Sequence, residues 1–337
     1  MGDSRSPEAG LVAAADSLPR RSHASLRWAI LRRSLLPRPS SAASGHPSDM
    51  STKKVSRKKG GGFNLIPCHP LVDTHLVQDP EVSRRVKILA GPRDVCLHYK
   101  LPLENAPGLV MIQRMEESLD LYDFMISSQY DIDTTGLVCC WPSEDVLAWF
   151  CVNHRDMFGS KRVIELGSGY GLAGLAIAAC SDACEVVISD GNPDVVNYVQ
   201  RNITVNAEAF GGTQVKSMTL HWNQDKDINA LGTFDIVLAS DCTFFKDFHE
   251  SLAHAVKCLL KCSEASQAIF LGPKRGNSLE KFLEKIKEIG LNYELVENYD
   301  TRVWNIHQKL LADDTAWPNY DRDHFYPLLL RITFPQT

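Results

Sequence analysis

Three glycines at every second position, Gly167, Gly169 and Gly171, follow a short apolar run that carries Glu165 near its end. A second apolar run begins at Leu172, so the order predicts a strand, a tight loop and a helix. Glycine lets the backbone turn sharply and approach a ligand closely, because it has no Cβ. The helix N-terminus behind the loop offers free N–H groups. The pattern therefore predicts a binding loop for a nucleotide-type ligand.

Two ligands of this type fit the loop. Gly169 to Gly174 matches the dinucleotide pattern G-x-G-x-x-G, but Glu165 favours the other ligand. A pyrophosphate gains nothing from a carboxylate at its site, whereas a sulfonium ligand with an α-amino group can use one. The sequence acidic-x-Gly-x-Gly-x-Gly resembles motif I of the class I methyltransferases, which implies S-adenosyl-L-methionine (AdoMet) as cofactor. The residues of this segment predicted to bind it are Glu165, Gly167, Ser168, Gly169 and Gly171.

Further polar and aromatic residues end the later apolar runs. Asp190 lies twenty-three residues after Gly167, where a carboxylate can accept both ribose hydroxyls of a nucleoside. Trp222 follows the next run and is predicted to stack on an adenine ring. Asp241 ends the segment FDIVLASD, which is apolar enough to be buried on both faces. Because parallel strands bind ligands at their carboxyl ends, these side chains should meet at one edge of the sheet. Trp141 and Ser240 are expected at the rim of the same pocket.

The body of the chain alternates between strand and helix patterns, in the order βαβαβαβαβαββ. The predicted strands are 163–166, 186–190, 215–222, 234–241, 267–272, 293–299 and 326–334, with a long polar insertion between the last two. The predicted helices include 172–179, one beginning near Asp194, 248–262 and 278–289. A closing pair of strands without a substantial crossover is typical of class I methyltransferases, whose seventh strand is antiparallel. The expected fold is therefore α/β, with a Rossmann-like seven-stranded sheet.

The segment in front of this body predicts a small β-rich extension. Apolar runs at 86–90 and 95–101 about the turn 91–94 predict a hairpin, and 109–113 a third strand. A helix is expected over 116–127, then a strand or extended run over 137–141 that Pro142 stops, then a helix that Ser143 caps. The expected organisation is an arm over 1–62, an N-terminal subdomain over 63–135 and a catalytic domain over 136–337.

Taken together, five blocks resemble the seven-β-strand lysine methyltransferases known as family 16. They are Trp141-Pro142, the glycine loop with Glu165, Asp190, Trp222, and Asp241-Cys-Thr-Phe244. The resemblance covers residues 136–337 and implies AdoMet-dependent methylation of a lysine ε-amine. It makes Asp241 and Phe244 the catalytic residues. Asp241 would orient the amine and help its proton depart, and Phe244 would face the methylated ammonium through a cation–π contact of about 0.5–2 kcal/mol.

The segments CWPSEDVLAWF, SDGNPDVV, PKRGNSLEKF, ENYD and YPLLL are similar to plant-type members of that group that methylate calmodulin. This implies calmodulin as the protein substrate and transfer of up to three methyl groups. Lys274 and Arg275, expected at the carboxyl end of the fifth strand, would give the acidic substrate a local contact. Two alternatives remain open: a lysine methyltransferase for another protein, and a calmodulin-binding scaffold without catalysis.

Charge is unevenly distributed along the chain. Residues 1–60 hold twelve Lys/Arg and four Asp/Glu, a net charge of +8, which leaves −13 on the remainder. The arm is rich in Ser, Pro, Ala and Arg, a composition that predicts disorder. Six arginines and no acids lie between Arg20 and Arg38, in a segment that predicts a basic amphipathic helix for a membrane surface, a calmodulin-like groove or a leader. The basic run from Lys53 to Lys59 fits a nuclear import signal or an electrostatic contact equally.

Ten cysteines without a CxxC pair favour reduced thiols in a cytoplasmic or nuclear protein. No metal site is expected, because no histidine cluster accompanies them. The acidic body argues against nucleic acid as a partner, and no apolar run is long enough to span a membrane. A monomer is expected.

Overall fold

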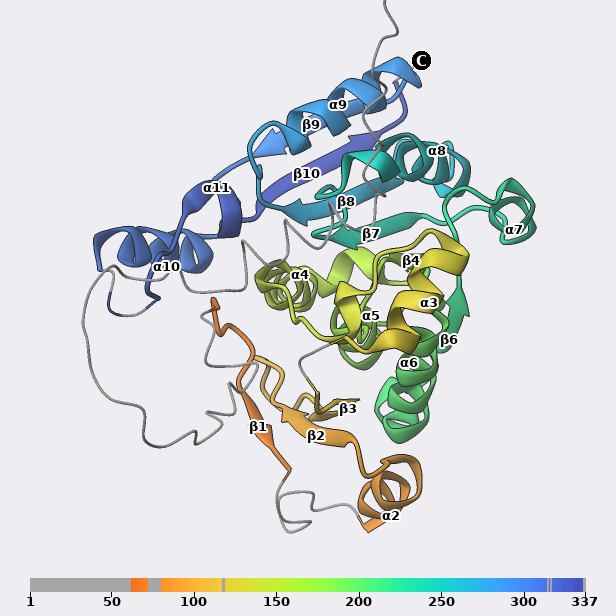
Figure 1. The fold of residues 1–337 in the computed structure, drawn as a ribbon, viewed down its shortest axis with the longest axis vertical. Coiled ribbons are helices and arrows are strands. Elements are labelled where there is room, and N and C mark those ends of the chain that lie inside the picture. The colour runs from red at the N-terminus through yellow and green to blue at the C-terminus, as the bar shows by residue number, and fades with distance from the viewer. Residues whose placement is uncertain (1–61, 72–79, 117–118, 314, 316, 336–337) are drawn as a thin grey trace, which may run out of the picture. The chain divides into compact units, whose positions relative to one another are not determined.

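The computed structural model describes residues 62–71, 80–116, 119–313, 315 and 317–335. The chain divides into two units, Met1–Ser51 and Thr52–Thr337, and every described residue belongs to the second (Figure 1). Apart from Gly62, the predicted disordered arm and its amphipathic helix lie outside the described residues.

A seven-stranded sheet forms the centre of the second unit, in the order β6-β5-β4-β7-β8-β10-β9. Strands β6, β5, β4, β7 and β8 run parallel, and β10 is antiparallel to both β8 and β9. The predicted Rossmann-like α/β sheet with an antiparallel strand is therefore confirmed. The strands are β4 (Arg162–Leu166), β5 (Glu185–Asp190), β6 (Gln214–Thr219), β7 (Ile236–Ser240), β8 (Gln267–Gly272), β9 (Asn292–Val296) and β10 (Leu328–Thr333).

Strand order reverses between β4 and β7, which are neighbours in the sheet. Because βαβ crossovers are right-handed, the helices after β4 and β5 cover one face and those after β7 and β8 the other. The loops after β4 and β7 therefore diverge and open a crevice at the carboxyl ends of the strands. These helices are α5 (Leu172–Cys180), α6 (Pro193–Val205), α8 (His249–Leu259) and α9 (Ser278–Glu288), with α7 (Asp225–Ala230) beside α8.

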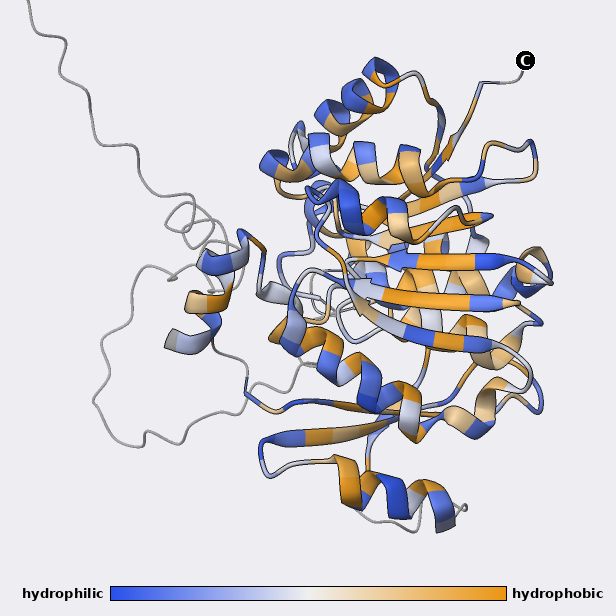
Figure 2. Cartoon of the chain, turned by 90° about the vertical axis from the view of Figure 1, so that its right-hand side faces the viewer, coloured by the Kyte–Doolittle hydropathy of each residue, from blue (hydrophilic) through white to orange (hydrophobic). Residues whose placement is uncertain are grey.

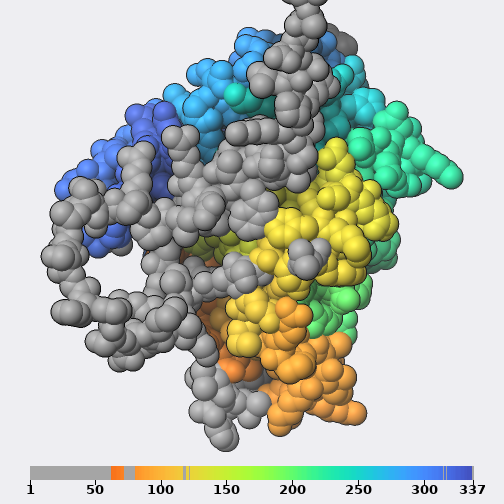
Figure 3. Space-filling model, in the orientation of Figure 1, coloured from red at the N-terminus to blue at the C-terminus, as the bar shows by residue number. Residues whose placement is uncertain are grey.

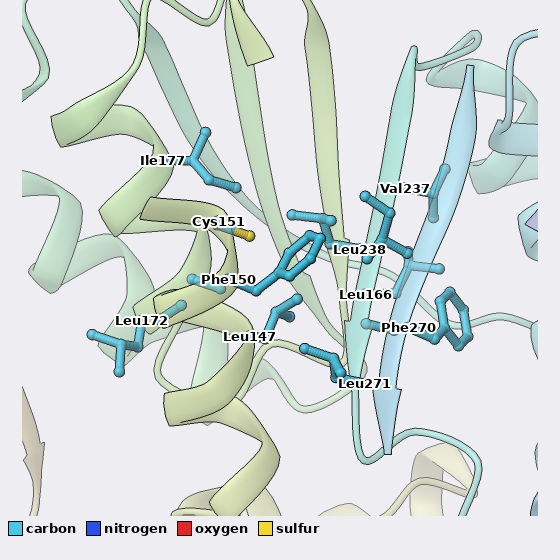
Figure 4. Packing of buried hydrophobic residues seen from close by; sticks show 14 of the residues in the cluster. Leu147, Phe150, Cys151, Leu166, Leu172, Ile177, Val237, Leu238, Phe270 and Leu271 are labelled. Atoms are coloured by element: carbon cyan, nitrogen blue, oxygen red, sulfur yellow. The ribbon is translucent and has the colours of Figure 1, made fainter. Parts of the chain in front are cut away.

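The parallel strands are apolar because both their faces are covered, and Figure 2 shows the hydrophobic residues along the middle of these strands. Helix α4 (Pro142–Asn153) packs against α5 and against strands β7 and β8. Figure 4 shows Leu147 and Phe150 of α4 beside Leu238 and Leu271 of the sheet. All four side chains are almost fully buried, so α4 holds the residue that precedes it, Trp141, in a fixed place at the crevice.

The front of the unit forms a small antiparallel sheet of β1 (Cys68–Pro70), β2 (Asp94–Tyr99) and β3 (Leu109–Arg114). Two asparagines hold the edge of this sheet, Asn202 of helix α6 and Asn206, which caps the end of that helix. Asn206 Oδ1 accepts a bond from Val110 N at 2.8 Å, and Asn202 Oδ1 accepts one from Ile112 N at 2.7 Å. These bonds satisfy two backbone N–H groups of β3 that would otherwise need a neighbouring strand as a partner. Figure 3 shows this part, in orange, at the end of the unit opposite α9.

The predicted strand over 86–90 is wrong, because α2 (Pro80–Leu89) occupies that segment. Val82, Val86 and Leu89 repeat at helical spacing and pack with Val110 of β3. Ile88, which the strand prediction counted as apolar, is 71% exposed. The hairpin forms instead between β2 and β3, and the predicted strand over 109–113 is confirmed.

Two predictions around Trp141 are also wrong. Thr135–Leu137 forms a 3-10 helix, and residues 138–141 have no strand partner among the described residues. Trp141, not Ser143, is the N-cap of α4, because Pro142 already occupies the first helical position. Ser143 is fully buried in the first turn. Cys139 and Trp141 line the crevice.

The polar insertion between the last two strands folds into α10 (Thr301–Ala312) and α11 (Arg322–Phe325). Asp300 caps α10 by accepting bonds from Arg302 N at 2.8 Å and Val303 N at 2.9 Å. The helix expected over 116–127 begins later, as α3 (Leu121–Tyr130), where Asp120 provides the N-cap. The remaining 3-10 helices are Arg155–Phe158, Ala207–Phe210 and Lys246–Phe248. The proposed boundaries at 62 and 135 stay predictions.

Candidate functional site

A cavity of about 650 Å³ lies at the carboxyl ends of β4, β5, β6 and β7, within the size range of small-molecule sites. The structure brings together nine of the eleven residues that the sequence predicted for the site. They are Trp141, Gly167, Ser168, Gly169, Asp190, Trp222, Ser240, Asp241 and Phe244. Their roles stay predictions, but their convergence follows from the parallel sheet, which delivers the end of every strand to one edge.

The glycine loop between β4 and α5 forms one wall of the cavity. Gly167, Gly169 and Gly171 have φ of 59°, 55° and 81°, a left-handed conformation that favours glycine. A Cβ added to Gly169 would meet no protein atom within 4 Å, whereas one on Gly167 would lie 2.7 Å from Cys242 Sγ. Since Gly169 lines the cavity, the absence of its side chain leaves room there for a ligand.

Asp190 at the end of β5 holds the loop in place. Its Oδ2 accepts a bond from Gly169 N at 3.1 Å, and its Oδ1 accepts one from Asn192 N at 2.9 Å. Burial raises the pKa of Asp190 to about 6, against the opposing effect of these backbone N–H groups. The carboxyl is therefore ionised at neutral pH, and each oxygen keeps a lone pair for a ligand hydroxyl.

Aromatic rings form another part of the cavity wall. Trp222 is half-buried and packs edge-on against Phe248, with ring centroids 6.2 Å apart. His221 stacks on Tyr130 at 5.2 Å, and its Nε2 lies 2.9 Å from the carbonyl oxygen of Gly191. All four rings line the cavity. Flat apolar surfaces of this kind suit a purine ring.

Two predicted cofactor residues, Glu165 and Gly171, are absent from the described lining of the cavity. Glu165 is fully buried, and its Oε2 accepts a bond from Gly174 N at 2.8 Å in the first turn of α5. A Cβ on Gly171 would lie 2.8 Å from Ile188, so this glycine is required by packing. In this structure both residues support the binding loop from behind.

Burial raises the pKa of Glu165 from 4.5 to about 8, although the N–H of Gly174 opposes that rise. Between these two values the folded protein holds a proton that the unfolded chain has released, so stability falls as the pH rises. Glu165→Gln has no proton to lose. We expect the variant to gain about 2–4 kcal/mol in unfolding free energy relative to wild type between pH 5 and pH 8. Urea unfolding at both pH values measures this, and parallel pH curves for the two proteins would contradict it.

At the other end of the cavity, Asp241 meets a cation from its own chain. Arg275 Nη2 lies 2.7 Å from Asp241 Oδ1, and the two side chains are 7% and 5% exposed. The guanidinium carbon lies 4.6 Å from the ring centroid of Trp141 and 4.4 Å from that of Phe244. Trp141 and Phe244 are 6.3 Å apart. The Asp241 carboxylate and the two aromatic rings therefore contact the same guanidinium and form a site for a cation.

Arg275, expected to give the acidic substrate a local contact beside the site, lines the cavity, but its side chain is buried against Asp241. It also missed the cavity residues that come from outside the strand ends, such as Tyr130, Asp133 and Phe245. Phe245 alone carried a signal, because it directly follows the Asp241-x-x-Phe244 motif.

The residues present fit AdoMet. Gly169 leaves an open cradle, Asp190 presents a carboxylate with free lone pairs for hydroxyls, and Trp222 offers a ring to stack on. Within the described ranges, no group of three or more His, Cys, Asp or Glu side chains is placed to hold a metal ion.

Comparison with known proteins agrees with this geometry. The family model described as lysine methyltransferase matches residues 127–289. A calmodulin-lysine N-methyltransferase from Arabidopsis thaliana is 54% identical over 312 residues, which cover 93% of this chain and 97% of that protein. The mouse protein-lysine N-methyltransferase EEF2KMT is 26% identical over 48% of this chain and 52% of its own length.

A methyltransferase structure from Pyrococcus furiosus aligns with a TM-score of 0.40 at 15% identity, over 64% of this chain and 96% of that one. The order of the strands in the sheet identifies the fold, and the sequence identity of 54% identifies the family. The chain belongs to the lysine methyltransferase family.

Proposed function

We propose that this protein transfers methyl groups, up to three, to a lysine ε-amine of calmodulin. The observation that carries the proposal is the identity of 54% with a calmodulin-lysine N-methyltransferase along nearly its whole length. The geometry supports it, because Asp241, Trp141 and Phe244 form a cation site at one end of a cavity whose other walls fit AdoMet.

The chain's own residues have three tasks in this reaction. AdoMet supplies the methyl group when bound. Gly169, Asp190 and Trp222 hold the nucleoside part of the cavity, and Asp241 binds the lysine nitrogen and orients its lone pair. Only the neutral amine is a nucleophile, and the Asp241 carboxylate accepts the proton that the nitrogen loses. Trp141 and Phe244 hold the side chain and tolerate each added methyl group, because ring faces attract methylated ammonium as well as ammonium.

Charge raises a question about recognition, because residues 61–337 carry −13 and calmodulin is acidic. Unassisted, two acidic bodies repel at low salt. The arm of residues 1–60, with its net charge of +8, is the part of the chain suited to offset this repulsion. We therefore assign substrate attraction to the arm and chemistry to the cavity.

The proposal is tested by incubating the full-length protein with radiolabelled AdoMet and purified calmodulin. We expect label in calmodulin, on a lysine-containing peptide identified by mass spectrometry. Calmodulin whose lysines have been acetylated beforehand is the matched control, and we expect its labelling to fall at least about 100-fold, because acetylation removes the nucleophile.

The same assay distinguishes the alternatives. Label in another protein of a cell extract, with none in calmodulin, would indicate a lysine methyltransferase for a different substrate. Calmodulin binding without any methyl transfer would indicate a scaffold.

We also propose that the protein acts as a monomer in the cytoplasm and nucleus and does not bind nucleic acid. The basic run Lys53–Lys59 supports nuclear import, and the charge of −13 on the body disfavours binding to phosphate backbones. None of the described helices is long and apolar enough to cross a bilayer.

A further inference from the structure

Arg275 lies in the loop between β8 and α9. Its guanidinium lies between the rings of Trp141 and Phe244 and pairs with Asp241. These three residues are the ones assigned above to the substrate's lysine. A lysine ammonium binds the same kinds of partner, a carboxylate and two aromatic faces. The space for the acceptor cation is thus filled by a cation of the same chain.

The pair has unsatisfied groups that a permanent structural ion pair would normally satisfy. Arg275 bonds Asp241 through one nitrogen, not through the two-bond fork that guanidinium and carboxylate form when free to do so. Asp241 Oδ2 and Arg275 Nε are buried and have no hydrogen-bond partner among the described residues. Burying charges without completing their bonds costs free energy. A competing cation therefore displaces Arg275 at a lower cost than it would if the ion pair had all its hydrogen bonds.

The backbone on both sides of the pair is also in an unusual conformation. Asp241 and Arg275 have φ of 53° and 48°, although neither is glycine, and Gly276 follows with 67°. A bond of 2.6 Å from Arg275 N to the carbonyl oxygen of Asp323 holds the loop in place. Left-handed conformations are strained for residues other than glycine, and they cluster at functional sites. The strain indicates that the meeting of these two side chains is imposed by the surrounding structure.

We propose that Arg275 is an internal occupant of the lysine site, which the substrate's lysine must displace. This rests on the proposed lysine methylation. In the enzyme without substrate, Arg275 neutralises Asp241 and closes the cage. When a substrate binds, its lysine takes over Asp241 and the two rings, and the guanidinium turns outward. Arg275 is then a specificity-determining residue, because a lysine that is weakly held by the rest of the protein surface cannot compete with it.

Arg275→Lys tests this occupancy directly. A lysine side chain is one bond shorter than arginine, so its Nζ would lie about where the guanidinium carbon lies, between the two rings. We expect the variant to methylate itself at position 275. The nitrogen lone pair forms the N–CH₃ bond, the S–CH₃ bond of AdoMet breaks, S-adenosylhomocysteine leaves, and the nitrogen's proton passes to water through Asp241. Intact-mass and peptide mass spectrometry detect the added methyl groups.

Two controls separate self-methylation in the cage from random labelling. Self-methylation within one molecule is first order, so its rate constant should not change over a roughly 50-fold range of enzyme concentration. Methylation of one molecule by another would make the apparent rate constant rise with enzyme concentration. Lys274 is the internal control, because it is a natural lysine next in the chain and is not among the described residues that line the cavity. We expect it to stay unmodified. Arg275→Lys combined with Asp241→Asn should lose most of the self-methylation while binding AdoMet.

A second variant gives a readout without a new lysine. Arg275→Ala removes the occupant and opens Asp241 to water. If Arg275 fills the site about nine-tenths of the time, the KM for calmodulin should fall about tenfold, because only the unoccupied fraction binds substrate. An unchanged or raised KM would overturn the proposal, as would an Arg275→Lys variant that binds AdoMet and methylates calmodulin yet is never modified at position 275.

These results are independent of the choice of substrate. Self-methylation of the Arg275→Lys variant, together with a wild-type enzyme inactive on calmodulin, would reject calmodulin and keep the internal occupant. Wild-type activity on calmodulin, with position 275 unmodified in the variant, would reject the occupant and keep the proposed function.

Discussion

Asp241→Ala is expected to lower kcat about 10²–10⁴-fold, the usual contribution of a positioned acid–base group, and to leave AdoMet affinity within about twofold of wild type. The carboxylate lies at the cation end of the cavity, with Trp141 and Phe244, and acts on the amine. Single-turnover methylation of calmodulin gives the rate, and equilibrium dialysis with labelled AdoMet gives the affinity. A loss of affinity that parallels the loss of rate would make Asp241 a cofactor residue.

The unfolding free energy of Asp241→Ala must be measured together with its activity, because the substitution leaves Arg275 without its carboxylate partner. Breaking a buried ion pair typically costs about 3–5 kcal/mol. Asp123→Ala is the matched control, because Asp123 pairs with Arg114 at 2.9 Å and their side chains are 3% and 9% exposed, respectively. Asp123 is not among the described residues that line the cavity. We expect both variants to be destabilised, and only Asp241→Ala to lose turnover in its folded fraction. Equal loss of turnover in both would show that the effect is one of stability.

Gly169→Val is expected to weaken AdoMet binding at least about 30-fold while the protein stays folded. A Cβ at this position meets no protein atom within 4 Å, so the branched side chain enters the cavity without displacing neighbours. It takes up space that the ligand needs, and its φ of 55° adds about 1–3 kcal/mol of backbone strain. Titration with AdoMet and thermal unfolding measure the two effects separately.

Gly232→Val controls for the strain. Gly232 has φ of 68°, its added Cβ would meet only Arg162 at 3.8 Å, and it is not part of the described cavity lining. We expect similar destabilisation and unchanged AdoMet affinity. Gly167 is a poorer test, because its Cβ would collide with Cys242 and disturb the protein itself. Normal AdoMet affinity in Gly169→Val would show that the glycine loop does not hold the cofactor.

Residues 136–337 were largely predictable from the sequence. The strand at 267–272 was predicted with its observed bounds. The ends of the parallel strands were expected to bring Glu165, Asp190, Trp222 and Asp241 together, and all of these except Glu165 line the cavity. Such patterns are local, because a buried parallel strand is apolar on both faces and a sharp turn needs glycine. The topology of the parallel sheet then fixes where the strand ends meet, so local signals were enough.

The sequence by itself determined the sheet, the binding loop and the acidic residues at the strand ends. Tertiary structure alone decided how each of these side chains is used. It turned Glu165 behind the loop onto Gly174, folded residues 80–89 into a helix against β3, and brought Arg275 onto Asp241. The physical reason is that a side chain's partner depends on burial, on packing and on loops that meet from distant parts of the chain. The spacing of residues in the sequence does not specify those contacts. The pairing of Arg275 with Asp241 is the clearest example, because the two residues come from different loops.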